Sequence, residues 1–274
     1  MVSRPLVLGA VAYDAKVVTI WEGFRGFFLA HDLPFDFVLY SHYERQVEAL
    51  VGGQIDVAWS SPLAWVRTRR LAPQARAVAM RDTDGDLTSV VVVRADSPVH
   101  TAADLAGRTV GTGAVDSPQG TLLPLALLGD TPVEVRRFEV GVGLHGDHVG
   151  GERDAARALA AGEVDAACML DANHLRFAKE ATLRPGGTRV VAVTPRFDHC
   201  NFSVVADHDG LDRFVTLLLA MDYADPATRL LMDLEGLTAW LPGRTCGYAQ
   251  LEAAVDRFGF YGPAGELTAA DYRP

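Results

Sequence analysis

The chain has 274 residues, 49% of them hydrophobic and 22% charged, and its formal net charge at pH 7 is -10. That composition is typical of a folded globular protein, and the length suits one large domain or two lobes of ordinary size. The acidic balance argues against a nucleic-acid partner, because neutralising phosphates requires a basic face. No apolar run approaches the length of a membrane span. We also expect no nucleotide cofactor.

Cysteine usage and the start of the chain bear on the compartment. The three cysteines, Cys168, Cys200 and Cys246, have no close spacing, so neither a zinc ribbon nor a disulfide framework is indicated. An odd number suits a reducing compartment. Met1 leads almost directly into a strand-like run at 6–11, without the basic start, longer apolar stretch and cleavage site of a signal peptide. We therefore expect a cytoplasmic protein, or a periplasmic or cell-surface one if a leader has been removed.

Strands and helices alternate through the first part of the chain. The expected order is 5–12 (strand), 17–31 (helix), 35–40 (strand), 44–51 (helix) and 55–59 (strand). This alternation predicts a parallel sheet with right-handed crossovers, in which ligands bind beyond the carboxyl ends of the strands. The polar residues at those expected ends are Tyr13, Ser41, His42, Ser60 and Ser61.

The second helix has a capping-box pattern at its start. Ser41 would accept a hydrogen bond from a backbone amide of the first turn, and Glu44 would reach back to the Ser41 amide. Gly52 and Gly53 then end the helix.

The stretch from Asp56 to Val66 is interpreted as a short buried strand that runs directly into a helix. Ser60 and Ser61 end the strand, and Pro62 opens the helix, where its missing amide hydrogen is not needed and a preceding serine can cap the first turn. Amides and hydroxyls then point at the same place, which suits an anion or a polar small molecule. Taken alone, an ordinary strand-to-helix corner is an equally good interpretation.

The further expected strands lie at 75–80, 88–94, 108–113, 133–140, 164–169, 189–193 and 203–205. The architecture of the first part begins again at the strand 108–113, and the strand at 203–205 returns to the first lobe. The strand at 108–113 leads into Asp116-Ser117-Pro118-Gln119-Gly120-Thr121, a second corner of hydroxyls and amides at a helix start. The segment 162–167 (Gly-Glu-Val-Asp-Ala-Ala) echoes 53–58 (Gly-Gln-Ile-Asp-Val-Ala). This echo predicts two similar lobes, followed by a mostly helical remainder.

A glycine-rich segment with histidines and acids, at 141–152, has the side chains of a metal site. Imidazole and carboxylate groups suit zinc or non-haem iron with open coordination positions. Histidines in polar loops are usually just solvated or hydrogen-bonded, so a metal-free loop is the alternative. The candidate metal ligands are His145, His148, Glu152 and His199.

Two further side chains have a functional and a structural interpretation. Cys200 beside His199 has the components of a nucleophile and its base. Adjacent residues on a strand point to opposite faces, however, which favours a buried, inert cysteine. Trp59, at the end of its strand, is the tryptophan placed to line a cleft.

Several segments together carry a family resemblance. They are 53–65, the strand at 90–94 with Ser97-Pro98 after it, 104–111 (Asp-Leu-Ala-Gly-Arg-Thr-Val-Gly), 117–121, and the pair 154–156 and 162–166. In these segments the chain resembles the type II periplasmic-binding fold, and most closely the phosphate, phosphite and phosphonate substrate-binding family, as a divergent and apparently leaderless member. The resemblance spans roughly residues 5–210 and is more specific for the fold than for the ligand.

The resemblance implies two α/β lobes, each a mostly parallel sheet flanked by helices, which are joined by two crossover hinge strands and close on a small ligand. We expect residues 1–93 and 204–274 in the first lobe and 94–203 in the second. In the family a Ser-Gly-His-Asp-Ala run often carries a histidine that binds the oxyanion; the matching run here is 151–155 (Gly-Glu-Arg-Asp-Ala), so that histidine is absent. The negative charge of Glu152 opens the alternative of a zwitterionic or cationic ligand.

Two functions from different classes follow. The first is a binding protein of the kind that serves an ABC transporter, which clamps a polar, anionic or zwitterionic small molecule and, if exported, passes it to a permease. Its expected ligand-binding residues are Tyr13, His42, Trp59, Ser60, Ser61, Ser117, Gln119, Gly120, Thr121, Glu152, Asn173 and His174. The alternative is a cytoplasmic enzyme on the same fold, which uses a divalent metal (zinc or iron). Its candidate catalytic residues are His145, His148, Glu152, His199 and Cys200, with His174 contributing. Either protein would be a monomer or a dimer.

Overall fold

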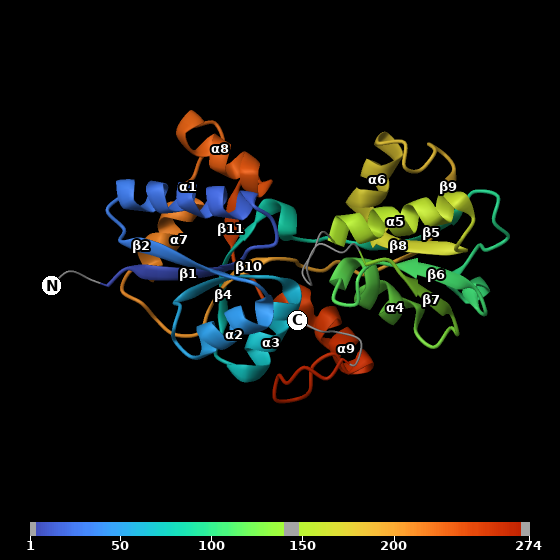
Figure 1. The fold of residues 1–274 in the computed structure, drawn as a ribbon, viewed down its shortest axis with the longest axis horizontal. Helices are drawn as coiled ribbons and strands as arrows, with labels where there is room; N and C mark the ends of the chain where they lie inside the picture. Colours follow the sequence, from blue (N-terminus) through green and yellow to red (C-terminus); the bar gives the residue numbers. More distant parts are fainter. Residues whose placement is uncertain (1–3, 140–147, 270–274) are drawn as a thin grey trace.

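Two mixed β-sheets, each flanked by helices on both faces, form two lobes that lie side by side (Figure 1). The structure is a computed structural model and describes residues 4–139 and 148–269. The expected two-lobed α/β architecture is confirmed.

The first sheet has six strands. Their order is β2 (Phe35–Tyr40), β1 (Leu6–Val11), β3 (Val57–Ser60), β10 (Asn201–Val204), β4 (Arg76–Arg81) and β11 (Trp240–Pro242). β1 is parallel to β2 and to β3, whereas β10 is antiparallel to β3 and to β4. The carboxyl ends of β1, β2, β3 and β4 therefore meet at one edge of the sheet, which faces the second lobe (Figure 1).

Helices pack on both faces of the first sheet (Figure 1). One face carries α1 (Lys16–Ala30), α7 (Leu211–Leu219) and α8 (Pro226–Glu235), and the other carries α2 (Tyr43–Val51) and α3 (Pro62–Leu71). Aromatic rings fill the layer beneath α1, where Trp21 and Phe28 contact Phe202 of β10 and Phe214 of α7. This packing holds the strands whose ends form the candidate site.

The second sheet has five strands. Their order is β7 (Glu134–Arg137), β6 (Thr109–Thr112), β8 (Ala166–Leu170), β5 (Ser89–Arg94) and β9 (Thr188–Val193). β5 is antiparallel to both neighbours, and β6 is parallel to β7 and β8. Helices α5 (His148–Ala161) and α6 (Asp171–Lys179) cover one face, and α4 (Leu123–Leu128) covers the other (Figure 1).

The sequence echo between the lobes has a structural cause. Asp56 N donates to Val7 O (2.8 Å), and Asp56 Oδ2 accepts a hydrogen bond from Val7 N (2.9 Å). In the second lobe Asp165 makes the same pair of bonds with Thr109, at 2.8 and 3.0 Å. Each aspartate therefore fixes the start of one strand against its parallel neighbour. The predicted similarity of the lobes is explained by this shared device.

Two segments, 82–88 and 194–200, connect the lobes and are called the first and second crossover segments. Leu87 and Phe197 join them as an isolated antiparallel bridge, with N–H···O distances of 2.8 Å in both directions. β5 pairs with strands of the second sheet and β10 with strands of the first, so the expected boundaries at 93/94 and 203/204 lie several residues too late. The four consecutive valines of β5 suit the interior of either sheet, so the sequence of this strand does not reveal which sheet it joins.

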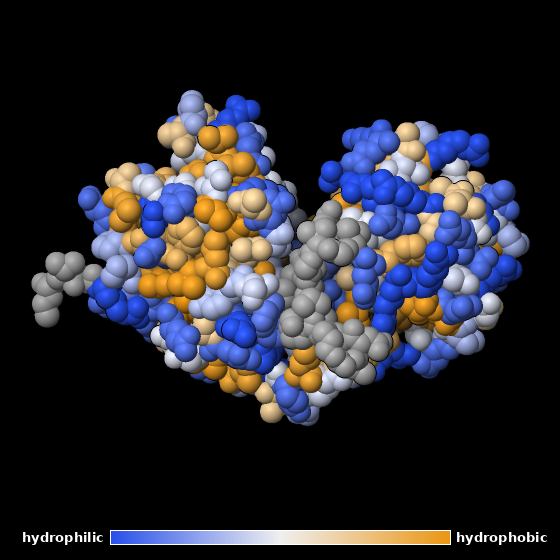
Figure 2. Space-filling model, in the orientation of Figure 1, coloured by the Kyte–Doolittle hydropathy of each residue, from blue (hydrophilic) through white to orange (hydrophobic). Residues whose placement is uncertain are grey.

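The C-terminal helix α9 (Ala249–Phe258) contacts both lobes. It packs against α3 of the first lobe and α4 of the second. The apolar cluster that results contains Leu63, Val66, Leu122, Leu123, Phe197, Leu251, Ala254, Val255, Phe260 and Tyr261. The lobes therefore share a core on this side, whereas the surface between them is hollowed on the side of α8 and α6 (Figure 2).

Candidate functional site

Ser61 begins α3 in the way that the sequence predicts. Its Oγ accepts a hydrogen bond from Ala64 N (3.2 Å), and Pro62 occupies the first turn. The preceding Ser60 is fully buried, and its Oγ has no hydrogen-bond partner among residues 4–139 and 148–269. A buried hydroxyl without a partner is unfavourable. Ser60 thus offers an unused donor and acceptor at the carboxyl edge of the first sheet.

The second lobe builds a matching corner after β6. Ser117 Oγ accepts a hydrogen bond from Gly120 N (3.0 Å), at the start of a π-helical turn, Pro118–Leu122, that continues into α4. Thr121 Oγ1 donates to Ala114 O (2.7 Å). Both corners therefore combine a capping serine, a proline and a helix start, as expected.

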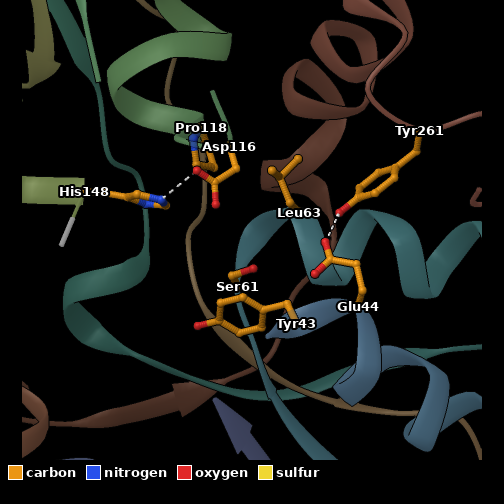
Figure 3. A pocket seen from close by; sticks show the side chains of 8 residues that line it. All are labelled: Tyr43, Glu44, Ser61, Leu63, Asp116, Pro118, His148 and Tyr261. Carbon is orange, nitrogen blue, oxygen red and sulfur yellow. Dashed lines mark hydrogen bonds and ion pairs between the residues drawn. The ribbon is translucent and has the colours of Figure 1, made fainter. Parts of the chain in front are cut away.

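The two corners meet at a small cavity between the lobes (Figure 3). Its lining residues are Tyr43, Glu44, Ser61, Leu63 and Tyr261, together with Asp116, Pro118 and His148 of the second lobe. Tyr261 donates to Glu44 Oε1 (3.3 Å), and His148 Nε2 lies 3.4 Å from Asp116 Oδ1. The cavity volume is about 20 Å³, which is room for about one water molecule. A larger ligand therefore requires the lobes to separate before it enters.

Glu152 of α5 is fully buried beside the second corner. Its Oε2 accepts hydrogen bonds from Leu170 N and Asn173 Nδ2, each at 2.9 Å. Burial raises the pKa of the Glu152 carboxyl group, although these two hydrogen bonds act in the opposite direction. Glu152 and Asn173 thus lie together near the second corner.

Arg81, at the end of β4, carries a positive charge to the junction of the first lobe and the crossover. Its guanidinium donates to both carboxylate oxygens of Asp84 (2.5 and 3.0 Å) and to Glu235 Oε2 (3.3 Å). Burial by itself would raise the pKa of Asp84, but Arg81 and a hydrogen bond from His199 outweigh it and lower this pKa to about 2. Burial and the Glu235 charge raise the pKa of Tyr13 to about 12, so Tyr13 remains a neutral hydroxyl.

Comparisons with known proteins agree with this geometry. The family model for the periplasmic phosphonate substrate-binding protein of ABC transporters matches residues 29–245. The chain belongs to this family. PhnD1 from Prochlorococcus marinus, in complex with methylphosphonate, has a TM-score of 0.67 and 17% identity over 93% of this chain and 98% of that one. XAC2383 from Xanthomonas citri, bound to ATP, has a TM-score of 0.69 and 18% identity over 93% and 98% of the two chains. No curated protein sequence matches.

Membership of the phosphonate-binding family makes this chain a small-molecule-binding protein of the ABC-transporter type. The family implies a small-molecule ligand and a permease as partners. Its members are described as periplasmic, so the cytoplasmic location expected from the N-terminal residues gains no support. Within the described ranges, none of the helices has the length and apolar character needed to cross a membrane.

The predicted metal ligands do not gather in one place. His145 lies outside the described residues. His148 pairs with Asp116, Glu152 is bonded to Leu170 and Asn173, and His199 lies in the second crossover segment. The described residues therefore do not support the expected site.

A different trio in the described part of the chain has donor atoms within 4.8 Å of one another, namely Asp84, His199 and Cys200. His199 Nδ1 lies 3.1 Å from Cys200 Sγ and 3.5 Å from Asp84 Oδ1, and its Nε2 lies 3.4 Å from Gln119 Oε1. Arg81 already binds both oxygens of Asp84. A cation would meet this guanidinium at close range, so the trio is better explained as part of the Arg81 ion-pair network.

The thiol of Cys200 does not have the environment of a nucleophile. Burial, followed by the negative charge of Asp84, raises the pKa of Cys200 well above its ordinary value, whereas catalysis needs the thiolate. The same nitrogen of His199 faces both Cys200 and Asp84. The aspartate therefore does not hold the imidazole from its far side, as in a catalytic triad. The enzyme hypothesis gains no support from this geometry.

Three other predicted ligand contacts have structural roles. Trp59 packs on Phe202 and Trp240 in the core of the first lobe, with Arg81 over its ring at 5.1 Å. His174 Nε2 lies 2.8 Å from Thr188 Oγ1, at the end of β9 remote from the crossover. His174 therefore faces away from the site, in contrast to the prediction. Thr121 uses its hydroxyl hydrogen on the backbone.

Sequence reasoning missed several residues of the site. Tyr43 directly follows Ser41 and His42, and Asp116 directly precedes Ser117. Their neighbours in the sequence could therefore have marked both residues as candidates for the site. Arg81 ends a strand whose carboxyl end belongs to the same edge. Glu235 and Tyr261 come from the helical C-terminal part, where no motif marks them, and only the packing of α8 and α9 brings them to the cleft.

Proposed function

We propose that this protein binds one polar small molecule between its lobes and presents it to an ABC permease. The observation that carries the proposal is the pair of matching corners, one from each lobe, which meet at a common cavity (Figure 3). Ser61 of the first corner and Pro118 of the second line this cavity. Ser60, which precedes Ser61, has an unused hydroxyl among the described residues. A permease partner favours a location outside the cytoplasm, in the periplasm or at the cell surface.

A thermal-shift screen of alkylphosphonates, alkylsulfonates, phosphate, amino acids and quaternary amines tests the proposal. Any compound that raises the melting temperature is then titrated by calorimetry, and we expect one molecule per chain. A screen in which no compound stabilises the protein or binds to it would count directly against this function.

Ser60→Ala separates binding from folding. Because Ser60 Oγ has no described partner, its removal should leave the melting temperature of the free protein unchanged or slightly higher. The affinity for the bound compound should fall about five- to tenfold, since one hydrogen bond contributes roughly 1 kcal/mol. Ser97→Ala is the matched control, because Ser97 lies after β5, beyond the end of that strand remote from the crossover.

A further inference from the structure

One oxygen of the buried Glu152 carboxyl group is unused. Oε2 accepts two hydrogen bonds, but Oε1 has no partner of normal geometry among the described residues, where the neutral side-chain amide of Gln119 is a further donor to the carboxyl group. The whole side chain is inaccessible to solvent. A buried carboxylate oxygen without a partner is costly, and folded proteins rarely leave one. The described residues therefore leave room for a stronger, charged donor at this oxygen.

Glu152 adjoins the place where the second lobe would contact a ligand. A Cβ atom added at Gly120 would come within 3.1 Å of Glu152 Cγ, so the side chain packs directly on the helix start of the second corner. His148, which lines the cavity, is four residues earlier on α5 and thus on the same face of that helix. Glu152 is one turn deeper than the cavity wall.

The charges around this place are those of a cation site. The cavity's lining residues in the described ranges include the carboxyl groups of Glu44 and Asp116 and contain neither arginine nor lysine. No arginine or lysine within those ranges forms an ion pair with Glu152 either, and the positive side chain that lowers the pKa of Glu152 is the His148 imidazole. A doubly charged anion would meet carboxyl groups from both lobes.

We propose, on the basis of the binding function above, that the ligand carries an ammonium or guanidinium group and that Glu152 binds this group through Oε1 when the lobes close. The ligand is then a zwitterion or a cation, and Glu152 determines this specificity. The acidic end of a zwitterion would face Ser60 and Ser61 in the first lobe. Ligand binding would also compensate the buried charge of Glu152.

Matched ligand pairs that differ in one cationic group test the inference by calorimetry. The probes are taurine and ethanesulfonate, β-alanine and propionate, 3-aminopropylphosphonate and propylphosphonate, and ethanolamine with its neutral isostere 1-propanol. The wild-type protein should bind the cationic member of at least one pair about tenfold more tightly, or better, as expected for a charged hydrogen bond. A preference for the member without the cation in every pair that binds would overturn the inference.

Glu152→Gln keeps the shape of the side chain and an oxygen for Leu170 and Asn173 but loses the charge. It should reduce the preference for the cationic member to threefold or less. Glu163→Gln is the control, because Glu163 is an exposed carboxylate of the same lobe, paired with Arg136 at 3.0 Å. If Glu152→Gln does not fold, Glu152→Asp, which withdraws the carboxyl group by one methylene, should lower the preference at least threefold.

The outcomes separate the two proposals. A wild-type preference that survives in the Glu152 variants would show that another group binds the cation and would overturn the inference while leaving the binding function intact. Failure of all eight probes and of the wider screen to bind would overturn the binding function itself, and the inference with it.

Discussion

Gly120 and Glu152 touch at the centre of the second corner, and their contact leaves no space for a larger side chain. A Cβ atom at Gly120 would lie 2.9 Å from Ser117 Oγ and 3.1 Å from Glu152 Cγ. We expect Gly120→Ala to lower ligand affinity about tenfold and the free energy of unfolding by about 1–3 kcal/mol, as for other overpacked sites. Calorimetry and urea unfolding measure the two effects.

Gly113→Ala is the control for this change. A Cβ atom there would be 3.6 Å from Ser117, an ordinary contact. An affinity loss of the same size in both variants would show that the corner is not as tightly built as described.

The Arg81–Asp84 ion pair should make the stability of the fold depend on pH in the acid range. Burial opposes ionisation of Asp84, but Arg81 and His199 lower its pKa from 3.8 to about 2. A lowered pKa stabilises the folded state above the unfolded value, and this contribution disappears as pH falls from about 4 toward 2. It amounts to about 2 kcal/mol.

The free energy of unfolding of the wild-type protein, measured in urea between pH 2 and 7, should therefore fall more steeply on the acid side than that of Asp84→Asn. Parallel curves for the two proteins would contradict the role assigned to this pair.

Side-chain roles were predictable where they are local. The cap formed by Ser61 follows from three adjacent residues, and the structure confirms it. The position of Glu152 was recognised, but its partners Leu170 and Asn173 lie 18 and 21 residues further along the chain, on other elements. Contacts of this kind depend on packing, which the local sequence does not encode.

At the scale of elements, Arg244 ties the two crossover segments together. It donates to Asp198 of the second segment (2.6 and 2.8 Å) and pairs with Asp86 of the first (3.0 Å). Asp198 is only 1% exposed and also accepts a hydrogen bond from Asp86 N (3.1 Å). Arg244 therefore sets the relative position of the segments about which the lobes would rotate.

Arg244→Ala leaves the buried Asp198 carboxylate without its cation. Because the Arg244 side chain is 38% exposed and Asp198 keeps the Asp86 amide as a partner, we expect a loss of about 1–3 kcal/mol in the free energy of unfolding, measured in urea at neutral pH. Arg229→Ala removes an exposed arginine that lies 4.0 Å from Asp233 and should cost less than about 1 kcal/mol. Similar losses in the two variants would contradict the role of Arg244 in holding the two crossover segments together.

The start of α2 shows how tertiary contacts override a local motif. The sequence predicted a capping box with Ser41 and Glu44, but the helix begins at Tyr43 after His42, and no side chain caps it. Glu44 is turned inward and accepts a hydrogen bond from Tyr261, 217 residues away. The expected strands, by contrast, were all found near their predicted positions, because alternation of apolar segments with turn residues is a local signal.

At the scale of the molecule, α9 couples the lobes through their shared apolar cluster. Leu251 is 1% exposed in that cluster, and Leu251→Ala should cost about 2–5 kcal/mol. Hydrogen exchange should show reduced protection in β3 of the first lobe and in β6 of the second. Leu230→Ala, at a side chain that is 66% exposed, is the control. Reduced protection confined to the first lobe would contradict the coupling.

The duplication of the lobes was predictable from the echo of 53–58 in 162–167, because each copy must place an aspartate at the same strand junction. The bridge made by α9 was not, since its apolar residues have the pattern of any helix that covers one face of a domain. The lobe boundaries also required the strand pairings.

The central claim is that both lobes close on one small molecule. Small-angle X-ray scattering of the wild-type protein, with and without a saturating compound from the screen, tests it most directly. We predict a smaller radius of gyration with the compound bound, because the lobes of the free protein have to open for entry and the bound compound then holds them closed. An unchanged radius of gyration at saturation would contradict the clamp.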